Sequence, residues 1–159
     1  MLIELTVSFP GKPKWGWRII LPIYREGIIA GSFDLIHPGY VRMFREAKHS
    51  VCYRLIVLLQ DDPTIDRPSK NKPVQTWEER AEILSSLKDV DEVLRYSTEK
   101  DLYSILESKQ GQDVVRILGS DYLGKRYTGE DLKISVYFCN RDHCYSLSLL
   151  KAKIKESLN

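Results

Sequence analysis

The stretch "GIIAGSFDLIHPGY", residues 27–40, joins a short apolar run to a turn and then to the start of a helix. The run at 27–31 is apolar and ends in glycine, which is typical of a buried strand. Pro38 fits the first turn of a helix, because the N–H that it lacks is not needed there. Apolar residues follow at helical spacing and predict a helix over 38–50. The stretch therefore reads as a strand, a turn and a helix.

The same alternation continues to the end of the chain. Thr76 with Glu79 three residues later is a capping box, which marks the beginning of a helix. The further predicted elements are strands at 53–60, 91–96, 114–119 and 133–139, and helices at 76–87, 99–108 and 146–158. This order predicts an α/β fold, with a Rossmann-like parallel sheet of about five strands and helices on both faces. Two short strands around a loop predict a β extension over 1–24, ahead of a main domain over 25–159.

The composition is that of a soluble globular protein of one domain. The chain has 159 residues, of which 43% are hydrophobic and 29% charged. A net charge of +2 argues against nucleic acid as a partner, but leaves room for a local basic pocket. The sequence shows no membrane span and no signal peptide, so the cytoplasm is the expected location. Cys52, Cys139 and Cys144 form neither a disulfide framework nor a paired set of zinc ligands, and no metal site is predicted.

Polar and glycine residues follow four of the predicted strands. Because ligands bind at the carboxyl ends of parallel strands, these segments are expected to form one site. They are residues 31–37, Asp61 and Asp62, residues 119–121 and residues 140–143.

His37 stands directly before the predicted helix start. The N–H groups and the dipole of a helix start favour phosphate, and an imidazole can donate to a phosphate oxygen. Gly39 removes a side chain where a ligand approaches the backbone. The alternative is that His37 only caps the helix. The surrounding polar segments favour a phosphate site.

Residues 31–40 resemble the GxFDxxHxGH signature of the cytidylyltransferase family of nucleotidyltransferases, with Tyr40 in place of the second histidine. Four more segments resemble family motifs in the same order. These are "TWEER" (76–80), "LKDVDEVL" (87–94), "LGSDYLGK" (118–125) and "RDHCYSLSLLKAKIK" (141–155). The resemblance covers residues 27 to 157, and within the family it is greatest to glycerol-3-phosphate cytidylyltransferases.

The resemblance implies a reaction in which a phosphate monoester attacks the α-phosphorus of a nucleoside triphosphate and pyrophosphate leaves. It implies transfer of CMP from CTP to a phosphorylated small alcohol such as glycerol 3-phosphate, with Mg²⁺ accompanying the triphosphate. Such transfers depend on positioning and on electrostatic stabilisation of the phosphoryl group. The resemblance also implies a homodimer.

The family motifs assign roles to residues of this chain. The catalytic residues are expected to be His37, Tyr40 and Lys72. Lys70 and Lys100 are expected to bind the acceptor. The expected nucleotide-binding residues are Gly31, Ser32, Phe33, Asp34, Gly39, Arg80, Gly119, Asp121, Arg141, Tyr145, Ser146 and Ser148. Ser146 is also expected to cap the last helix.

The sequence departs from the family pattern in ways that bear on its chemistry. Tyr40 is neutral near pH 7, so it lacks the charge of an imidazolium, and loss of one such contact costs on the order of 10²-fold in rate. Leu102 stands where glycerol-phosphate enzymes have a lysine, and Cys144 and Leu147 replace a glycine and a threonine. The "SDY" at 120–122 and "KPV" at 72–74 resemble sugar-phosphate adenylyltransferases. Two alternatives therefore remain: an adenylyltransferase acting on a sugar phosphate, and a nucleotide-binding module with weakened catalysis.

Overall fold

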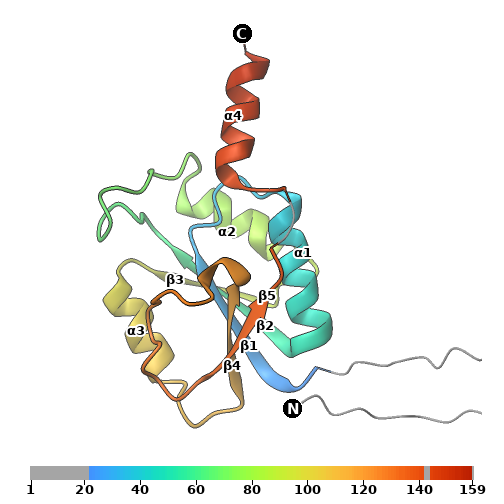
Figure 1. Ribbon diagram of the computed structural model, residues 1–159, viewed down its shortest axis with the longest axis vertical. Helices are drawn as coiled ribbons and strands as arrows, with labels where there is room; N and C mark the ends of the chain where they lie inside the picture. The colour runs from blue at the N-terminus through green and yellow to red at the C-terminus, as the bar shows by residue number, and fades with distance from the viewer. Residues whose placement is uncertain (1–21, 142–143, 159) are drawn as a thin grey trace, which may run out of the picture.

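A computed structural model of the chain describes residues 22–141 and 144–158 (Figure 1). The β extension that the sequence predicts over 1–24 lies almost entirely outside these residues. Five strands form one sheet in the order β3-β2-β1-β4-β5, and every neighbouring pair is parallel. The strands are β1 (Tyr24–Gly31), β2 (Cys52–Gln60), β3 (Glu92–Tyr96), β4 (Val114–Gly119) and β5 (Ser135–Cys139). The predicted Rossmann-like parallel sheet is confirmed.

Helices cover both faces of the sheet, as the sequence predicts. The helices are α1 (Pro38–Glu46), which continues as a π-helical turn (Ala47–Val51), α2 (Trp77–Ser85), α3 (Glu99–Glu107) and α4 (Leu147–Ser157). Of these, α1, α2 and α3 pack against the sheet. Phe44 of α1 and Leu84 of α2 pack with Ile29 of β1 in one core cluster. Leu102 of α3 packs with Ile28 in a second cluster. Because successive strand residues point to opposite faces, β1 contributes to both cores.

One strand begins earlier than the sequence predicts, for a polar reason. The first strand starts at Tyr24 rather than at 27, because its polar start also pairs with β2. There Glu26 bonds to Arg54 of β2 and to Lys109, each at 2.8 Å, and these ion pairs extend the ladder beyond the apolar run. Helix α3 begins at Glu99, as the sequence predicts, and a second capping box, Thr98 with Asp101, marks this start. The usual capping box has Glu or Gln in the position of Asp101, so the sequence pattern is harder to recognise.

The last helix, α4, stands away from the sheet and buries no residue (Figure 1). Its Lys151 reaches back to the buried carboxylate of Asp34, with Nζ 3.3 Å from Oδ2. Within the described ranges, no helix combines the length and the apolarity that crossing a membrane requires.

The strand order places a switch point beside β1. From β1 the chain adds β2 and β3 on one side of the sheet, and then crosses over to add β4 and β5 on the other. The connections that follow β1 and β4 therefore run to opposite faces, and a crevice opens between the carboxyl ends of these strands. In doubly wound sheets this crevice is where ligands bind.

Candidate functional site

A cavity of about 910 Å³ lies at the carboxyl ends of β1 and β4. It is bounded by segments that are far apart in the sequence, on both sides of the switch point. The predicted site residues that line it are Gly31, Ser32, Phe33, Tyr40, Lys70, Gly119, Asp121, Arg141 and Ser148.

The loop after β1 has a strained backbone that its contacts hold in place. Phe33 and Leu35 have φ values of 44° and 50°, in the left-handed region that non-glycine residues rarely adopt. The Phe33 ring is 3% exposed, and its centroid lies 5.3 Å from that of Tyr40 in an edge-to-face contact. The buried carboxylate of Asp34 accepts from the N–H groups of Val74 and Gln75, at 3.0 and 3.1 Å. Strain of this kind persists only where the surroundings fix it, and it concentrates at functional sites.

His37 caps helix α1, which confirms one of its two interpretations. Its Nδ1 accepts from the backbone N–H of Gly39 at 3.2 Å. A neutral imidazole that accepts at Nδ1 carries its proton on Nε2 and can donate from there. The ring is 5% exposed and stacks on Tyr40, with the centroids 4.2 Å apart. Tyr40 lines the cavity, whereas His37 is not among the residues that line it.

Tyr40 is a neutral hydrogen-bond donor at this wall. Burial raises the pKa of its phenol, and the positive charge of Arg141 only partly opposes this effect. The hydroxyl therefore stays protonated near pH 7, where it can donate one hydrogen bond but carries no charge.

Gly119 allows two of the predicted nucleotide-binding residues to meet. Arg141 Nη1 lies 3.2 Å from Asp121 Oδ1, above the end of β4. A Cβ atom on Gly119 would lie 2.4 Å from Arg141 Cδ and from Asp121 Oδ1. The backbone N–H of Arg141 donates to Ser120 Oγ at 3.1 Å, which ties the segment after β5 to the end of β4. The absence of a side chain at Gly119 thus allows Arg141 and Asp121 to form their ion pair at the end of β4.

The start of α4 supplies hydroxyl groups to the same region. Ser146 Oγ accepts from the N–H of Leu149 at 3.2 Å, which confirms the predicted helix cap. Ser148, in the first turn, lines the cavity. Tyr145 lies under the guanidinium of Arg42, with the Arg42 Cζ atom 5.0 Å from the ring centroid.

The three predicted lysines do not converge on one point. Lys70 lines the cavity. The Lys72 side chain is 80% exposed, and its Nζ lies 3.9 Å from Asp62 Oδ2. Lys100 is exposed on the first turn of α3 and is not among the residues that line the cavity. Their catalytic and acceptor-binding roles stay predictions.

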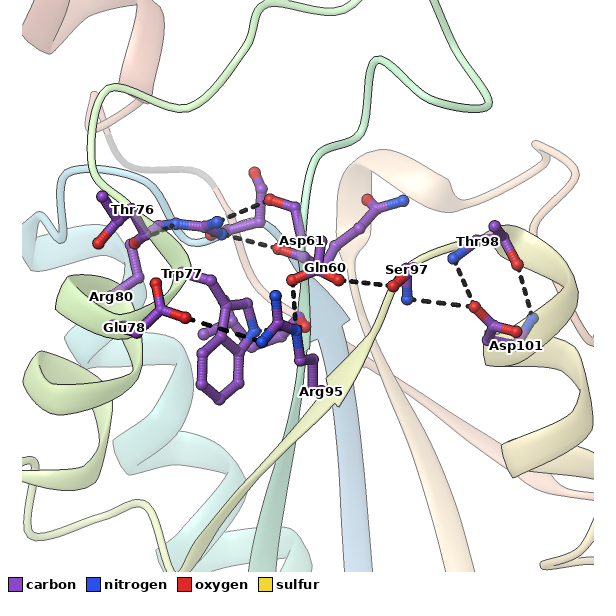
Figure 2. A network of polar contacts seen from close by, with 12 residues as sticks. Gln60, Asp61, Thr76, Trp77, Glu78, Arg80, Arg95, Ser97, Thr98 and Asp101 are labelled. Atoms are coloured by element: carbon purple, nitrogen blue, oxygen red, sulfur yellow. Dashed lines mark hydrogen bonds and ion pairs between the residues drawn. The ribbon is translucent and has the colours of Figure 1, made fainter.

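Arg80, predicted to bind nucleotide, donates its guanidinium N–H groups to backbone carbonyls beneath the site (Figure 2). Its side chain is 1% exposed. Nη1 donates to Ser32 O at 2.6 Å and to Gln60 O at 2.8 Å, and Nη2 donates to Asp61 O at 2.7 Å. Nε donates to the carbonyls that precede α2. Arg80 therefore joins the ends of β1 and β2 to the start of α2. In this structure its guanidinium serves the scaffold of the site.

Several residues that line the cavity were not predicted from the sequence. Gln60, Arg67, Tyr96 and Arg116 line the side of the cavity that faces α3. Arg116 gives the clearest signal, because a charged residue interrupts the apolar strand "VVRILG". For metals, no cluster of three or more His, Cys, Asp or Glu side chains suited to an ion occurs in the described part of the chain.

Comparison with known proteins connects this site with a family. Residues 28–140 match the family model described as cytidylyltransferase-like. The chain is 34% identical over 110 residues to the bifunctional protein HldE of Rhodopseudomonas palustris, an alignment that spans 69% of this chain and 22% of that protein. Over 118 residues it is 35% identical to HldE of Caulobacter vibrioides, covering 74% and 23% of the two chains. The chain thus spans less than a quarter of the length of these relatives.

Among solved structures, a lipopolysaccharide core biosynthesis protein from Thermoplasma volcanium is similar, with a TM-score of 0.49 and 20% identity. The match covers 84% of this chain and 88% of that one.

Replacement of Arg80 by methionine is expected to lower the free energy of unfolding by about 3 kcal/mol, because it leaves the buried carbonyls of Ser32 and Gln60 without their charged donor. Urea denaturation measures this change. Arg95→Met is the matched control, since the Arg95 side chain is 54% exposed and its loss is expected to cost less than about 1 kcal/mol. Equal losses in the two variants would contradict the scaffold role of Arg80.

Proposed function

The chain belongs to the cytidylyltransferase-like family, and from this premise we propose that it transfers a nucleotidyl group from a nucleoside triphosphate to a phosphorylated small molecule of the sugar-phosphate type. Family members are nucleotidyltransferases, and the enzyme class follows from membership. The substrates of this chain are the proposed part, since its relatives are several times longer than the aligned segment.

The observation that carries the proposal is the convergence of distant segments on one cavity. The first turn of α1 supplies Tyr40, and the segment after β4 supplies Asp121. The segment after β5 supplies Arg141, and the first turn of α4 supplies Ser148. These residues are brought together at the switch point of a parallel sheet, where such folds bind ligands. Hydroxyl, guanidinium and backbone donors at that point suit a polyphosphate.

In the proposed reaction, an oxygen of the acceptor phosphate forms a bond to the α-phosphorus of the nucleotide. The bond from the α-phosphorus to the bridging oxygen breaks, and pyrophosphate leaves with that electron pair. In this proposal the Tyr40 hydroxyl and the Arg141 guanidinium, both from residues that line the cavity, donate to phosphate oxygens, and Arg141 adds a positive charge where negative charge accumulates. His37 positions Tyr40 through the ring stack. Mg²⁺, whose preferred ligands are oxygens, is proposed to enter with the triphosphate and to neutralise part of its charge.

A homodimer is part of the same proposal. Helix α4 buries no residue, and Ile154 and the C-cap residue Leu158, four positions apart, are exposed on one of its faces. Exposed apolar side chains on a helix that stands away from the sheet favour burial against a second copy. Analytical ultracentrifugation measures the oligomeric state directly, and a monomer at high concentration would contradict it.

We expect pyrophosphate release with one of CTP, ATP, GTP or UTP when Mg²⁺ and a matching acceptor are present. The acceptor panel contains glycerol 3-phosphate and a set of sugar 1-phosphates, so that it covers both the cytidylyl and the adenylyl alternatives. Calorimetry with each nucleotide runs in parallel. Nucleotide binding without release from any pair would favour the binding-module alternative, and an absence of nucleotide binding would contradict the proposed function.

Tyr40→His is expected to raise kcat about 10-fold or more at pH 6, because an imidazolium adds the charge that a buried phenol lacks. An imidazole with a pKa near 6.5 loses this charge as the pH rises, so the ratio of variant to wild-type kcat should fall between pH 6 and pH 8. Tyr40→Phe keeps the stacked ring and removes only the hydroxyl, which makes it the matched control. A pH-independent ratio would show that charge at this position does not limit the rate.

A further inference from the structure

Three buried N–H groups without an acceptor belong to residues that line the same cavity. They are Gln60 Nε2, Arg67 Nε and Arg116 Nε, and all three residues line the cavity on the side of α3. Gln60 is 1% exposed and Arg116 is 6% exposed. Buried donors without partners are rare in folded proteins, because each costs free energy that a hydrogen bond would recover. Their occurrence together at one cavity wall indicates a ligand that supplies acceptors.

Arg116 is the centre of this group. It stands in the middle of β4, between apolar neighbours, on the sheet face that α3 covers. The bond from Nη1 to Ile28 O is long, at 3.4 Å, and among the described residues no carboxylate lies within ion-pair distance of the guanidinium. Burial lowers the pKa of Arg116, but an arginine remains charged in proteins. Among the described residues, this buried positive charge therefore has no direct ion-pair partner.

The groups around Arg116 compensate its charge only in part, because Glu99, a carboxylate that acts on it, also pairs with Arg67. Its nearest electrostatic partners include the phenols of Tyr96 and Tyr122, which are neutral near pH 7. Burial raises the pKa of Tyr96 further. The carboxylate of Glu99 is already engaged, with Oε1 2.8 Å from Arg67 Nη2 and Oε2 accepting from Thr128.

Arg67 and Gln60 add further N–H donors beside Arg116, from the end of β2 and the loop that follows it. Arg67 Nη2 donates to Gln60 Oε1 at 3.2 Å, which orients the Gln60 amide so that Nε2 remains available. The charges of Arg116 and Arg67 both act on the phenol of Tyr96, so the two guanidinium groups approach the same place from β4 and from the loop after β2. A planar guanidinium with vacant N–H groups matches the paired oxygens of a phosphate or a carboxylate.

We propose that Gln60, Arg67 and Arg116 form an anion subsite that binds the phosphate or carboxylate group of the acceptor. The identification of the bound ligand as the acceptor rests on the proposed function. The binding of an oxyanion at this subsite does not depend on the proposed function. It lies on the α3 side of the switch point, whereas Tyr40 and Ser148 enter the cavity from α1 and α4. The acceptor and the nucleotide thus occupy opposite halves of one cavity.

The test is calorimetric titration of the full chain with inorganic phosphate and, separately, with acetate, at constant ionic strength in chloride and without nucleotide. Wild-type protein is expected to bind at least one of the two oxyanions, and the preference between them identifies the anionic group of the acceptor. Arg116→Met is expected to weaken that binding at least 10-fold, and Arg116→Lys, which keeps the charge but not the fork of donors, to weaken it less. Failure of wild type to bind either anion, or equal binding by wild type and Arg116→Met, would overturn the proposal.

Two further measurements distinguish a loss of anion binding from a loss of folding, and test the anion subsite independently of the proposed function. Arg116→Met removes a buried charge that is compensated only in part, so its melting temperature without phosphate should equal or exceed that of wild type, whereas phosphate should stabilise only wild type. Arg45→Met, on the exposed side of α1 where the Arg45 side chain is 58% exposed, is the control and should bind phosphate like wild type.

Nucleotide affinity should change less than two-fold in Arg116→Met. A parallel loss of nucleotide affinity would place Arg116 at the nucleotide phosphates and overturn the acceptor assignment. If no nucleotide binds to wild type while phosphate binding still depends on Arg116, then the proposed function fails and the anion subsite stands.

Discussion

The guanidinium of Arg80 is the constraint on which the site depends. The carboxyl ends of β1 and β2 leave carbonyl groups that no further strand pairing satisfies, and these ends must lie close together beneath the cavity. Arg80 donates to one carbonyl after β1 and to two at the end of β2, so one buried cation completes both strand ends (Figure 2). Because hydrogen bonds to charged donors are the stronger ones, this arrangement fixes the two loops against each other.

The strained loop after β1 is a consequence of this fixed frame. Arg80 holds Ser32 by its carbonyl, and Asp34 is held by two N–H groups from the segment that leads into α2. Phe33 lies between the two residues that are held in this way, Ser32 and Asp34. It has a positive φ and packs in the core beside Tyr40. The backbone cost of such a conformation, of order 1–3 kcal/mol, is sustained by anchors on both sides. The loop therefore holds Phe33 against Tyr40, which lines the cavity from the first turn of α1.

The sequence predicted the fold well, because its signals are local. Alternating apolar runs and helical spacing gave the strand and helix order, and the Thr76 and Ser146 caps were recognisable from single residues. The side of the cavity that faces α3 was not predicted, since Arg67 and Arg116 are distant in sequence and belong to no motif. The shared environment of these two residues exists only after β4 has been placed beside β1. Arg80 shows the converse: its motif position indicated a nucleotide contact, whereas its hydrogen bonds go to carbonyls in the interior.

Arg80 and Arg116 show why burial and residue type alone do not separate a structural arginine from a binding one. Both are almost fully buried, at 1% and 6% exposure, and burial lowers the pKa of both. The three nitrogens of Arg80 donate to five backbone carbonyls, so its guanidinium is bound into the interior of the protein. Arg116 makes one long hydrogen bond and has a buried Nε–H without an acceptor. A buried charge of the second kind lowers the stability of the empty protein, and an oxyanion that occupies the cavity recovers that loss as binding free energy. The same residue type thus stabilises the fold beneath two strand ends and, within β4, is proposed to bind a ligand.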